Sequence, residues 1–181
     1  MEDVLCRLEA RVEELVARFS TRRPYMSETE KIRPRVMEFI NNGMVGVDIG
    51  CGNDKIFTTA IGVDSRKLPG VDVVADVTCI GLAFVEGGRF DYVYSSHCLE
   101  HVEYPRLVLR QWLWLLRENG VIVLYLPHKD FYTVHNPEHL QKFTQKDVEE
   151  MLKESRCRIL CSEMDLGYDR YSFLVVGQKY D

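Results

Sequence analysis

The sequence lacks a long hydrophobic run, and none of its apolar stretches approaches the ~18 residues that a membrane-spanning helix needs. Its N-terminus also lacks the basic start and the apolar core of a signal peptide. We therefore expect a cytoplasmic protein without a membrane partner. The chain has 181 residues, of which 46% are hydrophobic, and this is enough for one sizeable core.

Cysteine is present, but not in a pattern that binds a metal or builds a disulfide framework. The chain has six cysteines, and no two of them form a CxxC pair. Most lie in or beside apolar runs, which is typical of reduced, buried thiols. We expect neither disulfides nor a cysteine-based zinc site.

The sequence also lacks clustered positive charge. The formal net charge is -5, and the basic residues form only two short stretches, at residues 21–24 and 31–35. A dedicated nucleic-acid binder needs clustered lysine and arginine for its phosphate contacts. We expect no nucleic-acid partner and predict that both basic stretches are solvated faces.

The most informative segment is an apolar strand that ends in a carboxylate and runs into glycines. It reads MetValGlyValAspIleGlyCysGly, from Met44 to Gly52. Glycine lets ligand atoms approach the backbone closely, and it permits a positive φ that a Cβ would disfavour. The turn from Asp48 through Gly50 to Gly52 therefore predicts a cradle for a nucleotide-like cofactor.

Three further apolar runs end in polar side chains. They span residues 60–64, 71–76 and 90–94, and they lead to Asp64, Asp76 and Ser95. Ligands of open parallel sheets bind at the carboxyl ends of the strands, near the point where the strand order reverses. We therefore expect these residues to converge with Asp48. A carboxylate at Asp64 can accept both hydroxyls of a ribose.

The rest of the chain alternates between helix and strand. Residues 106–118 are apolar on nearly all sides and predict a buried helix, and the run from Val121 to Leu126 suits a central parallel strand. Thr144 can cap a further helix, and two closing runs, 157–163 and 172–178, allow a hairpin. The prediction is an α/β fold: a Rossmann-like, mostly parallel seven-stranded sheet with an antiparallel C-terminal edge hairpin.

Two helices are expected before the glycine turn. Residues 2–19 carry the 3.6-residue apolar stripe of an amphipathic helix, and Ser27 with Glu30 forms a capping box for a second helix that ends near Gly43. We predict a helical extension over residues 1–43 that precedes a catalytic domain over residues 44–181. The first helix can complete the core.

Taken together, these motifs resemble the class I S-adenosylmethionine-dependent methyltransferases of the small, single-domain type, over roughly residues 40 to 181. Asp64 is similar to the ribose-binding acid of that family, and Asp76 with Val77 is similar to its adenine-contacting pair. The run PheAspTyrValTyrSerSerHisCysLeuGluHisVal is similar to its fourth motif. The resemblance implies S-adenosylmethionine as cofactor, bound by Asp48, Gly50, Cys51, Gly52, Lys55, Asp64, Ser65, Asp76, Val77, Ser95 and Ser96. It also implies a second possibility for the first helix, which would pack across the cofactor cleft or join two subunits in a homodimer.

The sequence departs from that family in two places after the glycine turn. Asn53 and Asp54 replace the usual third glycine, and only residues 53–59 separate the turn from the next strand. A crossover with a full helix needs ten to twelve residues or more, so we expect about one helical turn or a loop here. Lys55 is then a candidate positive charge near the methionine carboxylate of the cofactor; the alternative is a solvated loop lysine.

Histidines are the candidate catalytic residues for methyl transfer to an oxygen or nitrogen atom. All five lie between positions 97 and 139. His97 and His128 follow strands four and five, at the edge where an acceptor would meet the methyl group, and each could act as a general base near pH 7. A structural hydrogen-bonding role is equally open for both. Glu100 and His101 are expected to shape the site.

A metal site is disfavoured. His97 and His101 are four residues apart, as are His135 and His139, and helical pairs of this spacing can chelate zinc. However, AsnPro at 136–137 disfavours a continuous helix across the second pair, and Glu100 is not in the HExxH position. We therefore predict no metal.

The acceptor is constrained mostly by exclusion. The loop over residues 128–139 is expected to contribute to a lid, with Phe131 and Tyr132 lining a pocket for a small-molecule or glycan-type acceptor. One alternative is a catalytically inactive methyltransferase-like interaction module, which would use the N-terminal helix and the Trp114 face. A dehydrogenase-like nucleotide binder is disfavoured, because Asp64 follows Gly50 by 14 positions and the dinucleotide fingerprint has roughly 20.

Overall fold

The sheet has seven strands in the order β3-β2-β1-β4-β5-β7-β6. A computed structural model describes residues 26–84, 86–165 and 170–180 of the chain. The predicted helix over residues 2–19, the basic stretch at 21–24 and the proposed dimer contact lie outside these residues. The strands are Gly46–Ile49 (β1), Ile61–Asp64 (β2), Val73–Val74 (β3), Phe90–Ser96 (β4), Leu116–Pro127 (β5), Cys157–Met164 (β6) and Ser172–Lys179 (β7).

The strand directions confirm the predicted fold class. β1 pairs in parallel with β2 and β4, β2 with β3, and β4 with β5. β7 pairs antiparallel with β5 and β6, so that the C-terminal hairpin forms the edge of the sheet. The strand order reverses at β1, which therefore lies between β2 and β4. Residues at the carboxyl ends of these parallel strands meet at one edge.

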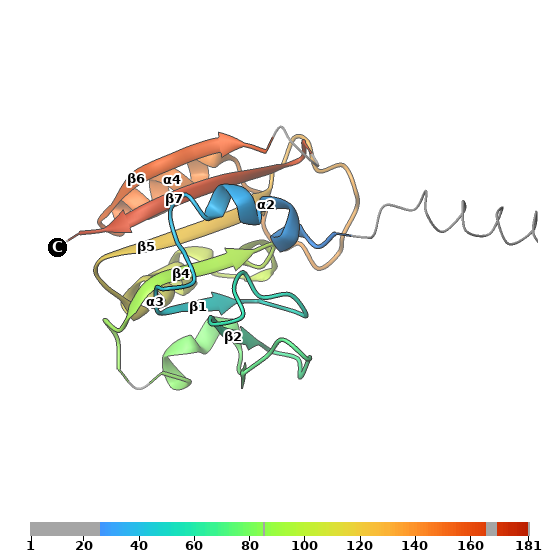
Figure 1. Ribbon diagram of the computed structural model, residues 1–181. Coiled ribbons are helices and arrows are strands. Elements are labelled where there is room, and N and C mark those ends of the chain that lie inside the picture. Colours follow the sequence, from blue (N-terminus) through green and yellow to red (C-terminus); the bar gives the residue numbers. More distant parts are fainter. Residues whose placement is uncertain (1–25, 85, 166–169, 181) are drawn as a thin grey trace, which may run out of the picture.

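Helices cover both faces of the sheet (Figure 1). One face is covered by α3 (Pro105–Leu115), α4 (Gln145–Glu154) and the 3-10 helix η1 (Val77–Leu82), and its buried cluster includes Trp112. The other face is covered by α2 (Glu28–Val36) and by the loop that carries Ile56 and Phe57. A second 3-10 helix, η2 (Leu99–His101), follows β4. None of the helices in the described ranges has the length and apolar character needed to cross a bilayer.

Local side-chain contacts explain where the helices begin and end. The Ser27 hydroxyl accepts a hydrogen bond from the Glu30 amide, as its predicted capping role requires, but α2 ends at Val36 and not near Gly43. Thr144 and a residue three positions later, Asp147, form a reciprocal capping box at the start of α4. Such caps satisfy amides that have no partner inside the helix.

Two further predicted element boundaries were wrong. The helix expected over residues 106–118 ends at Leu115, because Leu116 already pairs with Phe90 of the neighbouring strand. The strand expected over residues 71–76 is reduced to Val73–Val74. In both cases the tertiary pairing, rather than the apolar run itself, decides where the element stops.

Candidate active site

A cavity of about 530 Å³ opens at the carboxyl ends of the parallel strands. This volume lies within the range of about 300–1,000 Å³ that is usual for small-molecule sites. Its walls come from the segments after β1, β2, β3 and β4 and from the loop before α4. It is lined by Gly50, Asp64, Ser65, Arg66, Asp76, Val77, Thr78, His97, Cys98, His101, Val102 and Glu138.

The glycine turn needs glycine for two separate reasons. Gly50 has a φ of +75°, and a Cβ at this position would lie 2.5 Å from Cys98 Sγ. Gly52 has a φ of +56°, but a Cβ there would have no heavy atom within 4 Å. Left-handed conformations of this kind cost a non-glycine residue roughly 1–2 kcal/mol. The turn therefore brings bare backbone to the wall of the cavity.

Asp64 is the most strongly held carboxylate in the cavity wall, with only 4% of its surface exposed. Its oxygens accept hydrogen bonds from the Gly52 amide (3.1 Å) and from the amide (2.9 Å) and guanidinium (3.1 Å) of Arg66. Burial acts to raise the pKa of Asp64, but the bonds from Arg66 and Gly52 outweigh it and lower the pKa below its ordinary value. The carboxylate is thus ionised and can accept hydrogen bonds from a ligand.

Asp76 supplies a second carboxylate to the same cavity, beside Val77 and Ser65. Its Oδ1 accepts hydrogen bonds from the Thr78 amide (2.8 Å) and from the Thr78 hydroxyl (2.7 Å). These bonds hold the pKa of Asp76 below its ordinary value. Asp76 thereby caps η1 while it remains exposed to the cavity.

The structure does not bring two of the predicted cofactor residues to the cavity wall. Asp48 is 1% exposed, and its Oδ2 accepts a hydrogen bond from the Ile56 amide at 2.6 Å. Burial raises its pKa to about 7. The Lys55 ammonium donates to the Ala60 carbonyl (2.9 Å) and contacts Asp72 Oδ2 (2.8 Å). Both side chains fix the loop after the glycine turn, and their contact with the cofactor stays a prediction.

Cys51, Ser95 and Ser96 are likewise absent from the residues that line this cavity. The Cys51 thiol is buried among the carbonyls of Gly52 and Gly70, and burial raises its pKa to about 12. The Ser95 hydroxyl donates to the Ile49 carbonyl at 2.8 Å and so ties β4 to β1. These side chains shape the strand ends, and a direct contact with cofactor remains a prediction for each.

The short crossover over residues 53–59 is a loop, the second of the two expected forms, and α2 holds it in place. The Arg33 guanidinium donates to Asp54 Oδ1 (2.9 Å), to the Ile56 carbonyl (2.9 Å) and to the Lys55 carbonyl (3.1 Å). Asp54 also accepts a hydrogen bond from the Ser27 hydroxyl. Asp54 is therefore directed toward α2, and it does not line the cavity beside Gly50.

The basic stretch at residues 31–35 is not simply a solvated face, as the sequence had suggested. Arg33 pairs with Asp54, and Arg35 pairs with Glu163 of β6 at 2.6 Å. About two-thirds or more of each arginine side chain is buried. The stretch anchors α2 to the loops and the strands beneath it.

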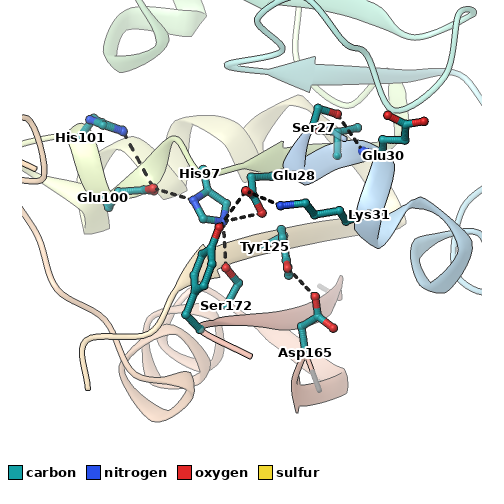
Figure 2. A network of polar contacts seen from close by, with 12 residues as sticks. Ser27, Glu28, Glu30, Lys31, His97, Glu100, His101, Tyr125, Asp165 and Ser172 are labelled. Carbon is teal, nitrogen blue, oxygen red and sulfur yellow. Dashed lines mark hydrogen bonds and ion pairs between the residues drawn. The ribbon is translucent and has the colours of Figure 1, made fainter. Parts of the chain in front are cut away.

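His97 lies in the cavity wall at the centre of a polar network (Figure 2). Its Nε2 is 3.0 Å from Ser172 Oγ and 3.8 Å from Glu28 Oε2, and its Nδ1 is 3.6 Å from Glu100 Oε1. Glu28 is held in turn by the Tyr171 hydroxyl at 2.8 Å. The imidazole therefore stands between two carboxylates that come from distant parts of the chain.

His128 lies in a different place. Its Nδ1 accepts a hydrogen bond from the Asp130 amide at 3.2 Å, and its ring contacts Phe131 and Phe173. It lines a second cavity of about 460 Å³, formed by residues 127–142, together with Tyr132. Phe131 is 55% exposed and is not among the lining residues. The structure thus separates the two candidate bases.

Several residues of the site were not predicted from the sequence. Arg66 and Thr78 each follow a predicted strand-end acid by two positions, so their contacts could have been anticipated from short-range turn chemistry. Glu28 and Ser172 could not, because they lie 69 and 75 residues from His97 in sequence. Only the folded sheet brings α2 and β7 to the end of β4.

The fold and the cavity define the class I methyltransferase architecture. A family described as "Methyltransferase domain" matches residues 19–162, and the chain belongs to it. This confirms the resemblance seen in the sequence. A search of curated proteins gave no significant match.

Solved structures with the same fold are distant in sequence. The 1,6-didemethyltoxoflavin-N1-methyltransferase of Burkholderia thailandensis, solved with S-adenosylhomocysteine, has a TM-score of 0.70 and 15% identity; 99% of this chain and 90% of that chain are covered. A putative methyltransferase of Bacillus halodurans has a TM-score of 0.66 and 10% identity, over 83% of this chain and 100% of that one.

A third structure shows that this fold does not dictate one reaction. The cyclase SpnF has a TM-score of 0.64 and 13% identity, over 83% of this chain and 80% of that chain. Function therefore has to be argued from the residues of the site.

Proposed function

We propose that the protein is an S-adenosylmethionine-dependent methyltransferase that methylates an oxygen or nitrogen atom of a small-molecule or glycan-type acceptor. The observation that carries this proposal is one cavity that joins the Cβ-intolerant turn at Gly50 to the ionised carboxylate of Asp64. The methyltransferase domain family supports the reaction class. The catalytically inactive alternative has no support in the described residues.

The cavity residues fit S-adenosylmethionine. Gly50 and Gly52 offer backbone that no side chain obstructs, Asp64 can accept the two ribose hydroxyls, and Asp76 with Val77 can contact the adenine. When bound, the cofactor supplies a methyl group that is already activated for transfer. The protein then has to hold the acceptor in line with it, and positioning alone can lower such a barrier by several kcal/mol.

His97 is the better candidate for the general base, because it lines the cofactor cavity and His128 does not. Glu28 flanks its ring, and a carboxylate in this place favours an imidazole that accepts a proton from a hydroxyl acceptor. The second cavity, lined by Tyr132 and His128, is the adjoining space for the acceptor: the rings of His101 and His139, one from each cavity wall, are 4.8 Å apart.

Calorimetric titration with S-adenosylmethionine and with S-adenosylhomocysteine tests the cofactor assignment. We expect the wild type to bind both with micromolar affinity and Asp64→Ala to lose this binding, because the ribose loses its acceptor. Asp130→Ala is the matched control, since Asp130 is exposed and lies outside the cavity walls. Unimpaired binding in Asp64→Ala would refute the ribose assignment, and no binding by the wild type would refute the proposed function.

The acceptor is to be sought by screening small hydroxyl- and amine-bearing metabolites and sugars for formation of S-adenosylhomocysteine. With an acceptor in hand, His97→Asn should reduce kcat by about 10²–10⁴-fold while cofactor affinity changes little. Asparagine is chosen because it tolerates the positive φ of 47° at this position. His128→Asn should retain most of the activity. The reverse result would make His128 the base.

A further inference from the structure

Glu100 places a buried carboxylate near the proposed acceptor site, and methyl transfer to a neutral acceptor does not by itself explain this carboxylate. Its side chain is 1% exposed, and neither carboxylate oxygen accepts a hydrogen bond from another described residue. Leaving a buried carboxylate without hydrogen bonds is costly, and such groups call for a specific explanation. A cation that this structure does not contain is one such explanation, and the neighbouring side chains allow it to be examined.

Besides His97, whose Nδ1 is 3.6 Å from Glu100 Oε1, two histidines from different segments lie close to this carboxylate. Glu100, His101 and His139 each offer a ligand atom, and these atoms all lie within 4.8 Å of one another. Glu100 and His101 belong to η2, whereas His139 lies in the loop between β5 and α4. The sequence had paired His101 with His97 and His139 with His135; the fold instead brings His101 and His139 together.

The tautomer of His101 suits a metal ligand. Its Nδ1 lies 3.0 Å from the Glu138 carbonyl oxygen, which can only accept, so Nδ1 carries the proton. The lone pair is then on Nε2, which is 3.9 Å from Glu100 Oε1. A backbone carbonyl that fixes the distal ring nitrogen is the usual outer partner of a metal-bound histidine.

The two segments are also fixed to each other through the backbone. The Gln141 amide donates to the Glu100 carbonyl at 2.9 Å, which holds the His139 loop against η2. The ring of His139 stacks on Tyr132, with centroids 5.1 Å apart. The three donors are thus brought together by the fold before any ion binds. In a tetrahedral Zn²⁺ site with bonds of about 2.1 Å the donor atoms are about 3.4 Å apart, so those that are now up to 4.8 Å apart would have to approach by up to about 1.4 Å.

We propose that Glu100, His101 and His139 form a binding site for a divalent transition-metal ion of the Zn²⁺ type, in the wall between the two cavities. Two imidazoles and one carboxylate are a donor set that suits Zn²⁺ and neighbouring transition metals, whereas Mg²⁺ prefers oxygen ligands. Three protein ligands leave a fourth position open. This position is available to water or to an oxygen of the acceptor.

The site is tested by metal titration of the full chain after treatment with a chelator and without cofactor. We expect calorimetry to give one equivalent of bound Zn²⁺ and Co²⁺ to develop the visible absorption of a tetrahedral complex. Glu100→Gln and His139→Ala should each weaken binding by at least about tenfold. His135→Ala is the matched control, because His135 is an exposed histidine of the same loop outside the cluster.

Thermal unfolding of the same variants gives a second readout. Zn²⁺ should raise the Tm of the wild type and of His135→Ala, because an ion that binds only the folded protein stabilises it. It should not raise the Tm of Glu100→Gln, because this variant lacks the carboxylate ligand. Equal Zn²⁺ affinity in the wild type and both site variants would overturn the proposal, as would displacement of Zn²⁺ by an equal concentration of Mg²⁺. These measurements are made without cofactor, so neither result bears on the proposed methyltransferase function. That function is tested separately by the titration with S-adenosylmethionine.

Discussion

The guanidinium of Arg33 in α2 lies 2.9 Å from Asp54 Oδ1, and with two backbone contacts it fastens the short crossover that follows the glycine turn. The crossover contains no helix, and one side chain from a distant element holds it in place. Arg33→Ala should therefore lower the free energy of unfolding by about 1–3 kcal/mol and weaken cofactor binding several-fold. Urea denaturation and calorimetry measure the two effects, with Arg110→Ala, exposed on α3, as the control.

Gly50→Ala should abolish cofactor binding. A Cβ at Gly50 would lie 2.5 Å from Cys98 Sγ, and the positive φ adds roughly 1–2 kcal/mol of strain. Gly81→Ala is the control, because a Cβ at Gly81 meets no heavy atom within 4 Å. Calorimetric titration with S-adenosylhomocysteine distinguishes the two variants. Normal binding by Gly50→Ala would mean that the turn does not form the cofactor wall.

Arg66→Ala should bind the cofactor more tightly than the wild type. The Arg66 guanidinium contacts both oxygens of Asp64, at 3.1 and 3.4 Å, and therefore competes with the ribose hydroxyls for the same acceptors. Each displaced hydrogen bond is worth about 0.5–1.5 kcal/mol, so a gain of a few-fold in affinity is expected. The dissociation constants of wild type and variant are compared by calorimetry. A marked loss of affinity would instead assign Arg66 to cofactor binding.

Asp48→Asn should remove a pH-dependent loss of stability. Burial raises the pKa of Asp48 from its ordinary range to about 7. The folded state thus binds the proton more tightly than the unfolded state, and the wild type loses stability as pH rises through this window. Asparagine retains an acceptor for the Ile56 amide and does not titrate. Relative to the wild type, the variant should gain roughly 2–3 kcal/mol between pH 5 and pH 8.

A control for this measurement is Asp91→Asn. Hydrogen bonding from the Val45 amide and from Arg117 holds the pKa of Asp91 below its ordinary value. Its titration is therefore complete below pH 5, and the difference from the wild type should stay constant from pH 5 to pH 8. Denaturant unfolding at several pH values measures both variants. A flat difference for Asp48→Asn as well would mean that Asp48 is ionised throughout this range.

The sequence predicted those residues of the candidate site that directly follow a strand. Gly50, Asp64, Asp76 and His97 each lie at or just after the end of a predicted strand, and the structure brings all four to one cavity. Lys55 was not predictable in the same way. Its neighbours in sequence gave no sign that its ammonium would pair with Asp72, because that contact depends on how β2 and β3 lie beside the crossover.

The sequence by itself determined the class of the protein, because the order of apolar runs and the polar residues that end them fix a parallel sheet with a switch point at β1. It also determined that the crossover could not hold a full helix. Only the tertiary structure decided which histidine meets the cofactor cavity and which pair faces Glu100. Such contacts join residues that are far apart in sequence: His97 and Ser172, for example, are 75 positions apart. Local propensity carries no information about side chains that meet across different elements.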